Sequence, residues 1–137
     1  MVGEVGFSPW INRQNKKEIE RNDFPGVYFI AKSKKVPSDY RVNNGSIIYI
    51  GETTGQTLGD RLSQFHNSAF NERPGHSGGN TFRGKLGEST PEELLWVSCC
   101  PVQMGEIYTS AYIKHLERKL IWEFVCTYGR LPSCNSA

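Results

Sequence analysis

The sequence has no long apolar run, and its longest wholly apolar stretches are only a few residues. A helix that crosses a membrane needs about 20 predominantly apolar residues. We therefore expect no membrane-spanning segment. Met1 to Glu4 also lack the basic start and the apolar stretch of a signal peptide, which favours a cytoplasmic protein.

Paired-cysteine motifs are absent as well. None of the four cysteines belongs to a Cys-x-x-Cys pair, and adjacent Cys99 and Cys100 have the spacing of neither a zinc site nor a redox site. We therefore expect buried or half-buried thiols in a reducing compartment.

Neither sign of charge is in large excess, with 16 lysine and arginine residues against 14 aspartate and glutamate residues. The net charge is +2 and the isoelectric point is about 8.4. A basic nucleic-acid-binding domain is more strongly marked by an isoelectric point above about 9. The charge therefore permits a nucleic-acid partner and does not require one.

The composition is that of an ordinary globular domain. The chain has 137 residues, of which 37% are apolar and 22% charged, so we expect one domain over 1–137. There is no internal repeat, low-complexity tract or linker. The polar segment 1–22 is expected to be an N-terminal extension, in which Ser8 and Pro9 predict the start of a short helix.

Strand and helix signals follow in a simple order. Aromatic and β-branched runs predict strands over 24–31 and 46–50, and the turn signal over 43–45 favours pairing them as a hairpin. Farther along, the patterns predict a loop over 51–59, a helix over 61–70 capped by Asp60, a break over 74–79, a short helix over 81–86, a strand over 92–100, and a helix over 110–128 ended by Gly129. The order β-β-α-α-β-α predicts a small α+β domain.

One acid of the last predicted helix lies on its apolar side. At about 100° per residue, five apolar residues fall in an arc of about 140°, and Glu117 falls inside that arc. The five are Ile113, Leu116, Leu120, Ile121 and Phe124. A carboxylate facing a core is costly unless something pairs with it. Glu117 is therefore either a structural acid with a buried partner or a metal ligand.

Two tyrosines stand on neighbouring predicted strands. Tyr28 follows Gly26-Val27, and Tyr49 precedes Ile50-Gly51. Strand tyrosines usually serve packing, but here both hydroxyl groups could meet in one pocket. Gly51, placed directly after the second strand, would let the backbone approach a phosphate closely.

Arg61, His66 and His76 are the next candidates. Arg61 opens a predicted helix and could point its guanidinium at the same pocket, or it could be a solvated first-turn residue. His66 lies about 140° around the helix from Arg61, so the two do not share a face. His76 lies in a Gly-rich loop, where a histidine is commonly solvated.

Together these elements resemble the GIY-YIG nuclease superfamily over residues 24–135. The likeness is carried by six elements in order: Gly26-Val27-Tyr28, Tyr49-Ile50-Gly51, Arg61, His76, Glu117 and Asn135. It implies a three-stranded antiparallel sheet flanked by helices. It also implies hydrolysis of DNA phosphodiester bonds with one divalent cation, Mg²⁺ or Mn²⁺.

The resemblance also implies roles for single residues. Glu117 would hold the metal and Arg61 would neutralise the scissile phosphate. Tyr28 would activate or bind water with Tyr49 beside it, and Asn135 would steady the site. A free tyrosine has a pKa near 10, so a positive charge nearby would have to lower it for Tyr28 to act as a base.

His76 and His66 would, by the same resemblance, help to position groups or transfer protons. Gly26 and Gly51 would support the site. The sequence departs from the family at Glu52, because members often carry lysine or another polar residue after the second motif.

The connection between the two tyrosine motifs is longer than is common in the family. Twenty residues separate Tyr28 from Tyr49, and the excess over 32–45 forms a basic hairpin tip that could grip a duplex. The expected DNA contacts are Lys32, Lys34, Lys35, Arg41, Arg83 and Lys85.

Several alternatives stay open on the sequence alone. The same fold could serve as a catalytically silent module that binds nucleic acid or protein. The nuclease could also act on RNA or branched DNA, because attack by water does not depend on the 2′-hydroxyl. A homodimer would double the surface that reads DNA, but no sequence feature demands one.

Overall fold

The computed structural model describes residues 6–20, 22–37, 45–71, 75–86 and 90–136. Along these residues the elements are β1 (Ile11–Asn12), α1 (Lys16–Glu20), β2 (Gly26–Lys32), β3 (Ile47–Thr53), α2 (Leu58–Phe70), α3 (Ser77–Lys85), the 3-10 helix η1 (Glu92–Leu94), β4 (Leu95–Pro101) and α4 (Glu106–Tyr128). The predicted α+β class is confirmed. The predicted order β-β-α-α-β-α is not matched exactly, because β1 and α1 precede β2 and the 3-10 helix η1 precedes β4.

The sheet has four antiparallel strands in the order β1-β4-β2-β3, so the expectation of three strands is wrong. The added strand is β1, whose Ile11 pairs with Val97 of β4. Ser8 does not cap a helix, because its Oγ accepts from the backbone N–H of Cys99 at 3.0 Å, while its own N–H donates to the Cys99 carbonyl oxygen. The segment expected to start a helix therefore lies along the free edge of β4.

Several element boundaries differ from the prediction. The strand expected over 92–100 begins only at Leu95, because Glu92–Leu94 form the 3-10 helix η1. β3 continues through Gly51 to Thr53, where a loop was expected, because Gly51 pairs directly with Tyr28 of β2. α2 begins at Leu58 rather than Arg61, since Thr57 and not Asp60 supplies the capping oxygen. α3 begins at Ser77 and α4 at Glu106, both earlier than expected.

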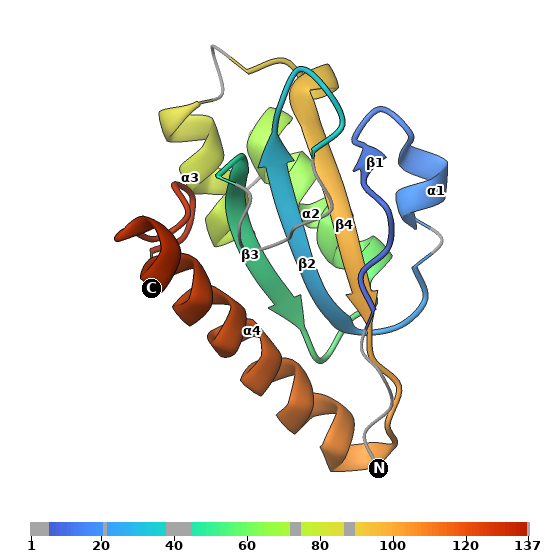
Figure 1. Cartoon of the computed structure of the whole chain (residues 1–137). Coiled ribbons are helices and arrows are strands. Elements are labelled where there is room, and N and C mark those ends of the chain that lie inside the picture. The colour runs from blue at the N-terminus through green and yellow to red at the C-terminus, as the bar shows by residue number, and fades with distance from the viewer. Residues whose placement is uncertain (1–5, 21, 38–44, 72–74, 87–89, 137) are drawn as a thin grey trace.

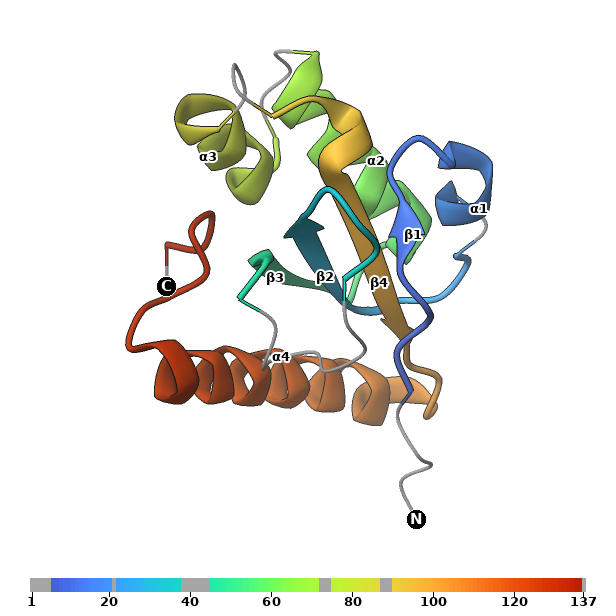
Figure 2. The same ribbon diagram turned by 45° about the horizontal axis from the view of Figure 1, so that its top comes forward.

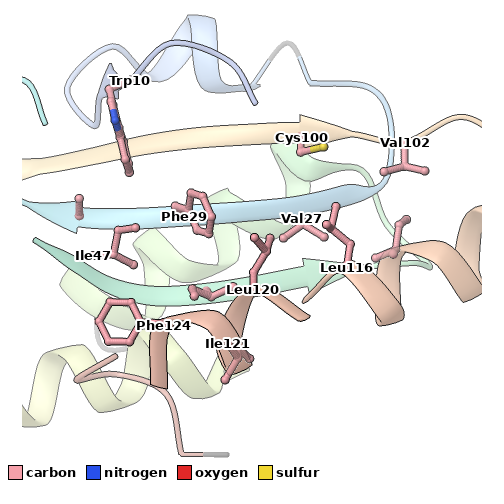
Figure 3. Packing of buried hydrophobic residues seen from close by; sticks show 13 residues of the cluster. Trp10, Val27, Phe29, Ile47, Cys100, Val102, Leu116, Leu120, Ile121 and Phe124 are labelled. Atoms are coloured by element: carbon pink, nitrogen blue, oxygen red, sulfur yellow. The ribbon is translucent and has the colours of Figure 1, made fainter. Parts of the chain in front are cut away.

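Helices cover both faces of the sheet, as Figures 1 and 2 show. α4 lies across one face, and α2 and α3 lie on the other. Figure 3 shows the core between the sheet and α4, which includes Trp10, Val27, Phe29, Leu116 and Phe124. Tyr28 belongs to the second core, on the α2 and α3 side, with Ile30, Leu62 and Phe65.

The predicted apolar arc of α4 is confirmed, because Ile113, Leu116, Leu120, Ile121 and Phe124 are all buried. Each such side chain contributes about 1.5–3 kcal/mol relative to an exposed one. The helix ends as expected at Gly129, whose φ of 69° places it in the left-handed region that glycine adopts freely.

The length of the apolar helices and the burial of the cysteines were both expected from features that the sequence lacks. Among the described residues, no helix is both long and apolar enough to cross a membrane. Cys99, Cys100 and Cys134 are buried as expected, whereas Cys126 is exposed on α4.

Candidate active site

Tyr28 and His76 form a buried pair beneath the β3 edge of the sheet. The Tyr28 hydroxyl lies 2.7 Å from His76 Nε2, and both side chains have 0% exposure. His76 is the N-cap residue of α3, and its backbone N–H donates to Ser68 Oγ of α2 at 3.1 Å. The expectation of a solvated loop histidine is therefore wrong. The Gly-rich segment packs against α2 and buries the imidazole ring of His76.

The hydrogen bonds of His76 determine which ring nitrogen carries the proton. Its Nδ1 accepts from the Gly79 backbone N–H at 3.0 Å, so the neutral ring carries its proton on Nε2 and donates it to Tyr28. Burial, and then the nearby charge of Arg61, lower the His76 pKa to about 3. His76 is therefore a neutral hydrogen-bond donor at physiological pH, and it does not take the Tyr28 proton.

Tyr28 is also held in its neutral form. Burial raises its pKa well above 10.0, and neighbouring Tyr49 raises it further. Arg61 acts in the opposite direction and lowers the Tyr28 pKa, but burial is the larger cause. Tyr28 is thus a protonated, inaccessible hydroxyl group.

Tyr49 is the more accessible of the two tyrosines. Its side chain is half-buried, and its ring lies at centroid distances of 6.0 Å from Tyr28 and 5.4 Å from His76. Burial raises the Tyr49 pKa, while a hydrogen bond with Ser77 lowers it. The two tyrosines meet as predicted, with Tyr28 inside and Tyr49 at the surface.

Glycines make room for this aromatic arrangement. A Cβ atom on Gly51 would lie 2.5 Å from the Tyr28 ring, and one on Gly78 would lie 2.5 Å from the Tyr49 ring. Gly51 therefore lies within β3 under two tyrosine rings, which is a packing reason for glycine there, and close approach of its backbone to a phosphate stays a prediction. Gly26 has a purely packing role, since a Cβ there would lie 2.1 Å from the Cys100 carbonyl oxygen.

Arg61 reaches the same region from the first turn of α2. Its guanidinium Nη1 donates to Gln64 Oε1 at 2.8 Å and lies 3.5 Å from the Gly75 carbonyl oxygen. Arg61 also lines a pocket of about 310 Å³ with the end of β3 and the following turn, namely Glu52, Thr53, Thr54, Gly55 and Gln56. A cation on the wall of an open polar pocket is suited to binding an anion.

Glu117 lies half-buried on the side of α4 that faces the sheet. Burial raises its pKa, and the neighbouring Glu52 carboxylate raises it further. Within the described part of the chain it has neither a hydrogen bond nor an ion pair, so the reading as a paired structural acid finds no partner there. Its charge also raises the pKa of Tyr49, which places both groups at the β3 edge.

A single divalent cation fits this donor set. Mg²⁺ prefers oxygen ligands, and protein sites often bind it through one or two carboxylates while it keeps several waters. Glu117 offers such a carboxylate, and Glu52 adds negative charge beside it. No cluster of three or more histidine, cysteine or acidic side chains suited to a metal occurs among the residues described. A cation held by Glu117 would therefore keep most of its ligands as water.

Asn135 fastens the outer edge of β3. Its side-chain Oδ1 accepts from the Ile50 backbone N–H and its Nδ2 donates to the Ile50 carbonyl oxygen, each at 2.9 Å. Ile50 lies between Tyr49 and Gly51 in the sequence. The amide of Asn135 therefore fixes the backbone next to the half-buried Tyr49.

Other predicted residues lie elsewhere. His66 Nδ1 is 3.7 Å from Glu92 Oε1 and its ring lies 5.1 Å from Phe70, so the structure brings His76 and not His66 to Tyr28. Arg83 and Lys85 donate to backbone oxygens of Ser68 and Ser133.

The basic hairpin tip begins at the far end of β2 from Gly26. Lys34 and Lys35 are exposed there and Lys32 is half-buried. Arg41 lies outside the described residues. Contact of these residues with DNA stays a prediction.

Three residues of the site were not singled out from the sequence: Gln64, Ser77 and Ser68. Gln64 had a usable signal, because a side chain three residues after Arg61 lies next to it on a helix. Ser77 and Ser68 had none, since their roles depend on how α3 packs against α2.

Comparisons with protein-family models, with curated proteins and with solved structures found no match to this chain. The likeness to GIY-YIG nucleases therefore rests on the residues that carry it.

Proposed function

We propose that the chain is a metal-dependent endonuclease that hydrolyses DNA phosphodiester bonds at the β3 edge of its sheet. One observation carries the proposal: β3, α2, α3 and α4 each bring a chemically suitable group to the same edge. These are Tyr49, Arg61, the His76 that holds Tyr28, and the half-buried Glu117, which has no ion pair with another described residue.

Each group has a role that follows from its surroundings. Arg61 would bind the scissile phosphate and offset the charge that develops on it. Glu117 would hold Mg²⁺ or Mn²⁺, which supplies a polarised phosphate and a more acidic bound water. Because burial raises the Tyr49 pKa, its hydroxyl keeps its proton near neutral pH and would orient water or phosphate by hydrogen bonding.

Tyr28 and His76 would support the site without contacting the substrate. Since both are fully buried, we assign the contact with substrate to Tyr49 and a supporting role to Tyr28. The His76 Nε2–H donates to the Tyr28 oxygen, so the Tyr28 proton remains available to a neighbouring acceptor. Approach of a substrate phosphate to Arg61 would change the charge around this pair.

A catalytically silent nucleic-acid-binding or protein-interaction module is the second candidate. Glu52 is the observation that favours it, because a carboxylate beside Glu117 places extra negative charge where a phosphate would enter. A bound divalent cation would offset that charge. The two candidates therefore differ in whether the protein cleaves DNA when a divalent cation is supplied.

The test compares wild type with Glu117→Gln on supercoiled plasmid, in Mg²⁺, in Mn²⁺ and in EDTA. We expect cation-dependent nicking or linearisation by wild type only. Glu123→Gln is the matched control, since Glu123 is another half-buried acid of α4. Cleavage by Glu117→Gln at the wild-type rate would refute the metal-ligand role.

Two further arms address the alternatives. A single-stranded RNA and a four-way DNA junction, offered under the same conditions, show whether another nucleic acid is the better substrate. Binding in a gel shift without cleavage of any of the three substrates would support the silent module.

A further inference from the structure

The guanidinium of Arg61 is held by a neutral amide. Its Nη1 donates to the side-chain Oε1 of Gln64 at 2.8 Å, and a second contact of Nη1, to the backbone oxygen of Gly75, is longer at 3.5 Å. The guanidinium also has a side-chain hydrogen bond with Tyr28. No ion pair joins Arg61 to a carboxylate of the described residues. A carboxylate would hold the guanidinium and offset its charge, whereas the Gln64 amide holds it and leaves the charge intact.

Gln64 is itself held in a defined orientation. Arginine has only donors, so Gln64 must present its oxygen to Arg61, and its Nε2 then donates to Gln56 Oε1 at 2.8 Å. Gln56 is tied to the end of β3, since its backbone N–H donates to Thr53 Oγ1 at 3.1 Å. Hydrogen bonds therefore connect Thr53 at the end of the sheet, through Gln56 and Gln64, to the guanidinium of Arg61.

These hydrogen bonds border the pocket that Arg61 faces. Gln56 and Arg61 both line the space of about 310 Å³ beside the β3–α2 turn. Among the described residues that line it, Arg61 is the one cation and Glu52 is the one carboxylate. Gln64 lies between Gln56 and Arg61 and forms a hydrogen bond with each of them. Its amide thus fixes how far the guanidinium projects into the pocket.

We propose that Gln64 is a positioning residue, which aims Arg61 at a phosphate in this pocket without reducing its charge. The inference rests on the proposed function, because the phosphate is that of the nucleic-acid substrate. Gln64 acts only through Arg61 and does not contact the reacting atoms. The pair is built locally, since residues three apart on a helix are neighbours.

The test uses two substitutions at one position. Gln64→Met keeps the length of the side chain and removes its hydrogen bonds, so Arg61 loses its 2.8 Å hydrogen bond and is held less firmly. Misplacement of a catalytic group by about 1 Å can cost about 100-fold, and we expect a fall in kcat of about 10- to 100-fold with little change in KM. Asn67→Ala, which alters another half-buried amide of α2, is the control and should leave kcat unchanged.

Gln64→Glu keeps an oxygen acceptor for Arg61 and adds a negative charge. We expect it to raise KM and to reduce the salt dependence of DNA binding by about one phosphate contact. Wild-type affinity and salt dependence in Gln64→Glu would show that the neutrality of this residue does not matter, which would overturn that half of the proposal.

A double-mutant comparison separates positioning from a general structural role. In an Arg61→Ala background, Gln64→Met should cause no further loss of kcat, because its effect passes through the missing guanidinium. Equal losses in both backgrounds would overturn the proposal.

A readout without cleavage keeps this proposal distinct from the proposed function. In ¹⁵N NMR spectra, the Arg61 Nη signals should be separate in wild type and averaged by rotation in Gln64→Met. Unchanged signals would overturn the positioning role even if the wild type cuts DNA. Signals that are separate in wild type and averaged in Gln64→Met, together with a wild type that cuts nothing, would support positioning and refute the nuclease.

Discussion

The buried His76 should make the fold sensitive to acid. Its pKa in the folded protein is about 3, because burial and Arg61 oppose its charged form, whereas an unfolded chain has the ordinary value near 6.5. The folded state therefore binds fewer protons, and the stability due to this group is fully present above pH 6.5 and is lost as the pH falls toward 3. One pKa unit is worth about 1.4 kcal/mol, so His76 should account for a loss of about 2 kcal/mol between pH 8 and pH 5.

Urea unfolding at pH 8 and pH 5 measures this loss, with His76→Gln as the comparison. Glutamine does not titrate, and its oxygen can still accept from the Gly79 N–H. We expect wild type to lose about 2 kcal/mol more than His76→Gln over this interval. Equal losses would refute the reasoning.

The ring signal of His76 gives a second measurement on the wild type alone. We expect no titration of this signal above about pH 4 while the protein stays folded. A midpoint near pH 6.5 would show that the ring is accessible and that the buried pair with Tyr28 is not formed.

Three further predictions concern the tyrosine cluster and its supports. Tyr28→Phe leaves a buried donor on His76 unsatisfied and should lower the free energy of unfolding in urea by about 1–3 kcal/mol. Tyr49→Phe should lower the free energy of unfolding less and reduce kcat more. The reverse order would contradict the assignment of the substrate contact to Tyr49. Asn135→Ala removes both hydrogen bonds to Ile50 and should speed hydrogen exchange of the Ile50 amide, so unchanged exchange would count against the clamp. Gly78→Ala places a Cβ against the Tyr49 ring and should destabilise by about 1–3 kcal/mol with loss of kcat, and wild-type behaviour would show that the ring moves without cost.

Periodic features of the chain were predictable, because they depend on geometry that any helix or strand shares. The arc of α4 placed Glu117 beside apolar residues before any contact was known, and the structure finds it half-buried. The hairpin strands were likewise predicted, and their pairing brings Tyr28 opposite Gly51. Tyr28 and Tyr49 could thus be expected on one face.

Features that depend on tertiary contacts were not predictable. A two-residue strand such as β1 has no periodicity to detect, and Ser8 is as good a helix cap as it is an edge-strand partner. The start of α2 was ambiguous because Thr57 and Asp60 are both capping residues. His76 is buried only because α3 packs on α2, and no local pattern in a Gly-rich segment contains that information.

The way in which the sheet ends has a consequence for self-association. Strand edges with unpaired N–H and C=O groups are templates for aggregation. On β3 the Ile48 oxygen accepts from the Cys134 N–H, and both backbone groups of Ile50 bond to Asn135. The segment that follows α4 therefore blocks strand addition by a second copy at this edge. A variant that loosens it would be expected to form aggregates as well as to lose activity, and a partner of this protein would have to bind through side chains at the β3 edge and not by extending the sheet.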